Sequence, residues 1–124
     1  MAAAHSPGFE KLCDEARSRI EEIDVAGAAR EHREGGAILV DVREESEWAA
    51  GHAQGAIHLG KGVIERDIET RVPDKSARLL LYCGGGYRPA LAAGNLRRMG
   101  YERVASVAGG WRAWTAAGLP TSKD

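Results

Sequence analysis

A short apolar run, a cluster of glycines and a helical pattern follow one another without a break, and this order limits what the chain can fold into. The apolar run occupies residues 79–82, the glycines are residues 84–86, and the helical pattern spans residues 89–99. A buried strand, a tight loop and the start of a helix account for this order. Successive glycines allow the positive φ angles that a tightly curled loop requires. We therefore predict a strand–loop–helix unit of an α/β domain.

Cys83 lies at the junction between the predicted strand and the glycines. The backbone N–H groups of such a loop and the positive end of the following helix stabilise a thiolate. Arg88 adds a positive charge at the end of the loop. A cysteine at the end of an apolar strand is otherwise an ordinary packing residue. The glycines, Arg88 and the helix start favour the interpretation of Cys83 as a nucleophile in an anion-binding cradle.

Short apolar runs alternate with helical patterns along the whole chain. The expected strands are residues 20–23, 37–42, 56–59, 79–82 and 104–107, and the expected helices are residues 9–20, 25–33, 44–50, 63–72, 89–99 and 111–117. This alternation predicts an α/β fold with a central, mostly parallel five-stranded sheet and helices on both faces. Residues 1–8 are expected to form a flexible tail, and residues 9–124 a single domain. Functional sites of such sheets lie at the carboxyl ends of the strands, where Cys83 falls.

The composition argues against several classes of protein. The 124-residue chain has a formal net charge of −1, which gives no global basic field for nucleic-acid binding. No apolar stretch approaches the roughly 20 residues of a membrane span. The first residues lack the basic and apolar segments of a signal peptide, so we expect a cytoplasmic protein. The two cysteines form no CxxC pair, and no metal site is expected.

The second cysteine, Cys13, falls on the apolar face of the helix expected at residues 9–20. We interpret it as a small packing residue, because cysteine is among the most frequently buried residue types. The alternative interpretation is a resolving thiol that acts together with Cys83.

Four stretches of the chain resemble the signatures of the rhodanese family of sulfurtransferases, and they occur in the family's order. They are LVDVR at residues 39–43 with Glu47-Trp48, GHAQGAIHL at residues 51–59, CGGGYR at residues 83–88 and VAGGWRAW at residues 107–114. Together they extend the resemblance from about residue 20 to residue 119. Ala53-Gln54 replaces the usual Ile-Pro pair, and Gly60 stands where a proline is common. Neither departure touches the chemistry.

The resemblance implies a rhodanese-like fold and a sulfurtransferase activity. Cys83 would attack the sulfane sulfur of a donor such as thiosulfate and carry it as a persulfide to cyanide or a thiol. The partners would be a small-molecule sulfur donor and acceptor, with a thiol protein or a desulfurase as further candidates. No cofactor, metal, nucleic acid or membrane is implied. The resemblance assigns substrate binding to Gly84, Gly85, Gly86, Tyr87 and Arg88.

Four further residues would support the site structurally: Asp41, Arg43, Glu47 and His52. Asp41 is expected to accept hydrogen bonds from N–H groups of the loop. Arg43 is expected to pair with Glu47, four residues further along a helix. His52 is expected to be a structural histidine, because a thiolate stabilised by the loop needs no general base.

The length of the loop separates the possible chemistries. Cys83 and Arg88 are spaced as Cys-x4-Arg, whereas the related dual-specificity phosphatases have one residue more. The shorter loop favours sulfur transfer over a phosphatase or an arsenate reductase. A sulfur carrier that works with protein partners and turns over thiosulfate slowly stays open as the alternative. The intact cysteine argues against a non-catalytic binding module.

Overall fold

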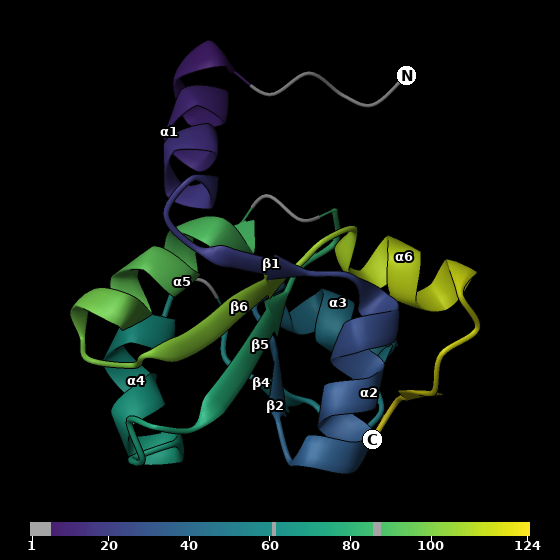
Figure 1. The fold of residues 1–124 in the computed structure, drawn as a ribbon. Coiled ribbons are helices and arrows are strands. Elements are labelled where there is room, and N and C mark those ends of the chain that lie inside the picture. Colours follow the sequence, from purple (N-terminus) through teal and green to yellow (C-terminus); the bar gives the residue numbers. More distant parts are fainter. Residues whose placement is uncertain (1–5, 61, 86–87) are drawn as a thin grey trace.

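The fold is built around five parallel strands. The computed structural model describes residues 6–60, 62–85 and 88–124, apart from the side chain of Arg88. The strands are β1 (Glu21–Ile23), β2 (Ile38–Asp41), β4 (Ile57–His58), β5 (Arg78–Tyr82) and β6 (Arg103–Val107). They pair in the order β1–β6–β5–β2–β4, and every pair is parallel, which confirms the predicted sheet. β5 is the central strand, so its carboxyl end lies in the middle of one end of the sheet (Figure 1).

Helices cover both faces of this sheet, as expected. After the first helix they are α2 (Val25–Gly35), α3 (Glu45–Ala50), α4 (Ile64–Arg71), α5 (Arg88–Arg98) and α6 (Gly110–Ala116). Leu79 and Leu81 of β5 pack in a core shared with α4 and α5. Leu80 and Tyr82 point to the other face and pack in a core shared with α2 and α6. Among the described residues, no helix combines the length and apolar character that crossing a membrane requires.

The first helix, α1 (Pro7–Arg17), lies at the end of the sheet where β5 ends and α5 begins (Figure 1). The Ser6 hydroxyl caps it by accepting a hydrogen bond from the Phe9 N–H at 3.4 Å. Proline is favoured at the first helical position, because its missing N–H would be unpaired there in any case. The expectation that residues 1–8 form a tail is therefore wrong for Pro7 and Gly8, which belong to the helix.

A second, two-stranded sheet was not expected from the sequence. β3 (His52–Ala53) pairs in antiparallel register with β7 (Thr121–Ser122), near the carboxyl terminus. The N–H of Gln54 also donates to the carbonyl oxygen of Pro120 at 3.0 Å. Strands of two residues are too short to show the alternation that identifies a strand in a sequence. This small sheet fixes the segment that follows α3, which supplies several of the site residues described next.

Candidate active site

Cys83 directly follows β5, at the carboxyl end of the central strand. Its side chain belongs to the core shared with α4 and α5, and the residue is only 3% exposed. Gly84 is partly exposed and Gly85 is exposed, so the chain emerges from the sheet within two residues. The cysteine is therefore inside the protein, while the loop that follows it is open to solvent.

The start of α6 holds the backbone of this loop. The Trp111 N–H donates to the carbonyl oxygen of Cys83 at 2.7 Å, and the Arg112 N–H donates to the carbonyl oxygen of Gly84 at 3.2 Å. In a trans peptide the N–H group points opposite to the carbonyl. The N–H groups of Gly84 and Gly85 therefore point away from α6, and they are free of the helix that holds their neighbouring carbonyls.

Gly110 is what allows α6 to approach so closely. Its φ angle is +53°, in the left-handed region that favours glycine. A methyl group on its Cα would overlap the carbonyl oxygen of Cys83. Gly110, the residue before Trp111, thus also shapes the loop that carries the cysteine.

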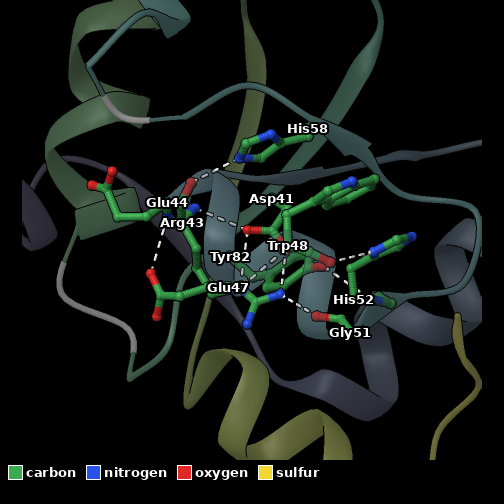
Figure 2. A network of polar contacts seen from close by, with 10 residues as sticks. Asp41, Arg43, Glu44, Glu47, Trp48, Gly51, His52, His58 and Tyr82 are labelled. Atoms are coloured by element: carbon green, nitrogen blue, oxygen red, sulfur yellow. Dashed lines mark hydrogen bonds and ion pairs between the residues drawn. The ribbon is translucent and has the colours of Figure 1, made fainter. Parts of the chain in front are cut away.

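A buried ion pair lies at the end of β2, beside β5 (Figure 2). Asp41 is fully buried, and Arg43 is 3% exposed. The Arg43 Nη2 donates to Asp41 Oδ2 at 2.8 Å and to the carbonyl oxygen of Gly51 at 2.6 Å. Burial lowers the pKa of Arg43, but the hydrogen bond and charge of Asp41 outweigh burial, so the pKa is raised. The guanidinium also lies over the Trp111 ring, 4.6 Å from its centroid.

The expected pairing of Arg43 with Glu47 is wrong. Arg43 pairs with Asp41 and not with Glu47, whose carboxylate instead accepts a hydrogen bond from the Glu44 N–H at 3.0 Å. Glu47 thereby caps the start of α3, because a glutamate at this position can reach back to an unpaired N–H. Among the described residues, Asp41 accepts a hydrogen bond from the N–H of Arg43 at 2.9 Å, within its own loop. A contact of Asp41 with N–H groups of the Cys83 loop stays a prediction.

Tyr82 connects this pair to the central strand. Its hydroxyl oxygen accepts a hydrogen bond from the Ala53 N–H at 3.0 Å. Burial raises the pKa of Tyr82, and the Asp41 carboxylate raises it further, so the phenol stays protonated. The residue before Cys83 is therefore tied to both β2 and β3 by buried polar contacts.

His52 and His58 stack on Trp48 (Figure 2). The ring centroids of His52 and Trp48 are 3.4 Å apart, and Nδ1 of His52 is 2.9 Å from the carbonyl oxygen of Trp48. Nε2 of His58 is 2.8 Å from the carbonyl oxygen of Arg43. Both imidazoles thus have partners in the β2–α3–β3 segment, and the structural role expected for His52 stays a prediction.

The structure adds one candidate that the sequence did not single out. Arg112 is exposed in the first turn of α6, and its Nη1 lies 4.0 Å from where a Cβ atom would stand on Gly85. A guanidinium therefore borders the cysteine loop. The basic residue after the tryptophan was visible in the sequence, but its closeness to Gly85 depends on the docking of α6.

The other expected substrate-binding residues lie wholly or partly outside the residues that the structure describes. Gly86 and Tyr87 are outside the described residues, as is the side chain of Arg88, whose backbone begins α5. Within the described part of the chain, no group of three or more His, Cys, Asp or Glu side chains is placed to hold a metal ion.

A parallel α/β domain with a cysteine-bearing glycine loop at the end of its central strand is the class of protein that the fold and site define. The family model of the rhodanese-like domain matches residues 25–117, and the chain belongs to this family.

Several solved structures are similar to this chain. A Rhodopseudomonas palustris protein of unknown function, a possible tyrosine phosphatase, is 30% identical with a TM-score of 0.81 over 98% of this chain and 99% of its own. The rhodanese-like domain of an Anabaena protein is 28% identical with a TM-score of 0.75, over 83% and 79% of the two chains. A Pseudomonas aeruginosa thiosulfate sulfurtransferase is 27% identical with a TM-score of 0.73, over 83% of this chain and 19% of its own.

The closeness of Gly110 to Cys83 leads to a prediction about loop geometry. We expect Gly110→Ala to lower the kcat of the reaction at Cys83 by about 10–100-fold, because a displacement of about 1 Å at a reacting group has effects of this size. Gly118→Ala is the matched control, since Gly118 has a φ of +70° but open space around its Cα. It should cost only the left-handed strain of about 1–2 kcal/mol in the free energy of unfolding, with turnover kept. Equal losses of turnover in the two variants would contradict the account.

The buried ion pair leads to a prediction about stability. Arg43→Met should lower the free energy of unfolding by about 3–5 kcal/mol, because it leaves the Asp41 carboxylate buried without a cation. The double variant Asp41→Asn/Arg43→Met removes that charge and should recover part of the loss. Urea unfolding of both variants measures the difference. A double variant no more stable than Arg43→Met would show that the loss does not come from an unpaired charge.

Proposed function

We propose that this protein is a sulfurtransferase that moves a sulfane sulfur from a donor such as thiosulfate to cyanide or a thiol through a persulfide on Cys83. Membership of the rhodanese-like family supports sulfur transfer as the general reaction. The observation that carries the proposal is the placement of the thiol. Cys83 directly follows the central strand, and the two peptide N–H groups after it point away from the helix that anchors their neighbouring carbonyls.

The first half-reaction loads the cysteine. The Cys83 thiolate attacks the outer sulfur of thiosulfate, and a bond forms between Sγ and that sulfur. The S–S bond of thiosulfate breaks, and its electron pair leaves with sulfite. Cys83 then carries one additional sulfur atom, and no metal or organic cofactor takes part.

The second half-reaction unloads it. Cyanide or a thiolate attacks the terminal sulfur of the persulfide, and the bond to Cys83 Sγ breaks. The electron pair of that bond returns to Sγ as the thiolate, which completes the cycle. Two successive displacements through one covalent intermediate give ping-pong kinetics.

Backbone N–H groups and cations would bind the anionic sulfur species. The N–H groups of Gly84 and Gly85 are proposed donors to the terminal sulfur of the persulfide, by the same logic as an oxyanion hole. Gly86, Tyr87 and Arg88 complete the loop in this proposal, with Arg88 as its cation. Arg112 supplies a second positive charge at the border of the loop. Gly84, Gly85 and Gly86 have no side chains and would leave room for a donor molecule to approach.

Two other functions would give different results in the assays described below. A sulfur carrier would form the persulfide from a protein donor but turn over thiosulfate slowly, and the exposed Gly85 is compatible with a protein partner. A phosphatase would hydrolyse phosphate esters, an activity suggested by the words "possible tyrosine phosphatase" for the Rhodopseudomonas protein. The Cys-x4-Arg spacing argues against the phosphatase.

Steady-state assays with thiosulfate and cyanide test the proposed reaction. We expect thiocyanate formation with parallel double-reciprocal plots, and no turnover by Cys83→Ser, because a hydroxyl cannot carry a persulfide. The serine hydroxyl nearly matches the thiol in volume, so thermal unfolding should show an intact fold. Full activity in folded Cys83→Ser, or hydrolysis of phosphate esters without sulfur transfer, would overturn the proposal. Persulfide formation without turnover would indicate the carrier.

The two arginines at the loop lead to a prediction about donor charge. Arg88→Ala should raise the KM for thiosulfate about 10- to 100-fold, as a charge-assisted contact of about 1.5–3 kcal/mol requires. Arg112→Ala should raise it about two- to fivefold, because solvent screens an exposed cation. Arg33→Ala is the control, since Arg33 is exposed near the end of α2, at the opposite end of the sheet. Equal effects on an uncharged sulfane donor would contradict a role in binding the dianion.

A further inference from the structure

A groove with a volume of about 580 Å³ lies between α1 and α5, near the end of the sheet that carries Cys83 (Figure 1). Residues from both helices line it, and we call it the α1–α5 groove. α1 lies before residues 25–117, which match the family model, so one wall of the groove is built by a segment outside that match. The proposed sulfur transfer makes no use of this groove.

The first part of the α1–α5 groove is apolar. Leu12 and Ala16 of α1 are four residues apart, which places them on one face of the helix. Leu91 and Gly94 of α5 line the groove from the other helix. Leu12 is 52% exposed, and it is the only large apolar side chain that is exposed among the described residues. A partner that covered this wall would remove apolar surface from water, which favours association.

Gly94 leaves a space in the wall that the fold does not require. It lies inside α5, where glycine is less favourable than alanine. Its φ is not positive, and a Cβ atom built on it would have no described neighbour within 4 Å outside its own stretch of helix. Neither the backbone conformation nor a close contact therefore requires a glycine here. A bare backbone in the wall of a groove does allow another backbone to approach closely.

The second part of the α1–α5 groove is basic. Arg19 follows α1, and Arg97 and Arg98 lie at the end of α5. The Arg97 Nη1 donates to the carbonyl oxygen of Arg19 at 3.3 Å, which joins the two sides of the groove. In the part of the chain that the structure describes, none of these three guanidiniums forms an ion pair with a carboxylate. Glu15 is the only acidic residue among those that line the groove, so positive charge is in excess.

We propose that the α1–α5 groove is a docking site for an amphipathic helix of a partner protein, in which an apolar stripe is followed by acidic residues. The apolar side chains of that helix cover Leu12 and fill the space beside Gly94, and its carboxylates face the three arginines. From Leu91 to Arg98 the groove follows about 10 Å of α5, which is roughly two helical turns. The inference goes beyond the proposed function and does not rest on it, because docking needs no reaction at Cys83.

The order of apolar and basic residues also sets the direction of the bound helix. Leu91 lies in the first turn of α5, eight residues after Cys83, whereas Arg97 and Arg98 lie in its last turn. The apolar part of the partner helix therefore lies at the end of the groove closer to the cysteine loop, and its acidic part lies farther away. A partner bound in this way stands beside the loop.

Fluorescence anisotropy measured on the full chain tests the proposal. The probe is a labelled synthetic helix of about 15 residues, with leucines at positions i, i+3, i+4 and i+7 followed by a turn of glutamates. One control peptide has lysines in place of the glutamates, and a second has serines in place of the leucines. We expect the acidic amphipathic peptide to bind, and its affinity to fall as the salt concentration rises. Both control peptides should bind more weakly by about tenfold or more.

Two variants of the protein locate the bound peptide. Gly94→Leu should weaken binding by about tenfold or more, because its side chain occupies the space that the peptide needs. Gly35→Leu is the matched control, since Gly35 also lies in a helix, at the end of α2, with open space around its Cα. The triple variant Arg19→Gln/Arg97→Gln/Arg98→Gln should weaken binding by about tenfold and remove most of its salt dependence. Circular dichroism and thermal unfolding should show that all variants are folded.

Several outcomes would overturn the proposal. They are no binding of the acidic amphipathic peptide, equal affinity for the acidic and the basic peptide, and equal affinity of Gly94→Leu and wild-type protein. Self-association of the wild-type chain that Gly94→Leu abolishes, without peptide binding, would assign the groove to a second copy instead. Binding to anionic phosphatidylglycerol vesicles in preference to the peptide would assign it to a membrane surface. None of these measurements involves turnover, so a failure here leaves the proposed function untouched.

Discussion

The geometry of the site depends on one contact, the docking of the first N–H groups of α6 on the carbonyl oxygens of Cys83 and Gly84. This contact orients two consecutive peptides, and with them the N–H groups that follow the thiol. It requires a glycine at position 110, because any side chain there would meet the Cys83 carbonyl. The sheet places the cysteine, and α6 sets the direction of the loop. In the proposed function, sulfur chemistry at this position would rely on backbone dipoles that are fixed before a donor arrives.

The buried Asp41–Arg43 pair supports the same region from the neighbouring strand. Arg43 contacts Asp41, the Gly51 carbonyl and the Trp111 ring, so it connects β2, the end of α3 and α6. A buried pair of this kind contributes little net stability compared with apolar residues, but breaking it is costly. Its value here is positional, because Trp111 also provides the N–H that holds the Cys83 carbonyl.

Local patterns in the sequence were enough to predict the sheet, the helices on its two faces and the position of Cys83. The strand–glycine–helix order is contained in about twenty consecutive residues, so no distant contact is needed to recognise it. The expected Arg43–Glu47 pair was wrong because the prediction used helical spacing alone and took no account of a competing partner for each residue. Asp41 was already buried beside Arg43, and the start of α3 needed the Glu47 carboxylate as a cap. Arg112 and the β3–β7 pair were missed because both depend on segments that meet only after α6 and the carboxyl terminus have docked.

The central claim is that Cys83 carries a sulfane sulfur, and the intact mass of the protein after exposure to thiosulfate and then cyanide tests it most directly. Measured on Cys13→Ser, so that no second thiol can consume the intermediate, the mass should rise by one sulfur atom. It should return to its starting value when cyanide is added, with thiocyanate in equal amount. An unchanged mass in folded protein after thiosulfate, or a gain of sulfur at a residue other than Cys83, would contradict the account.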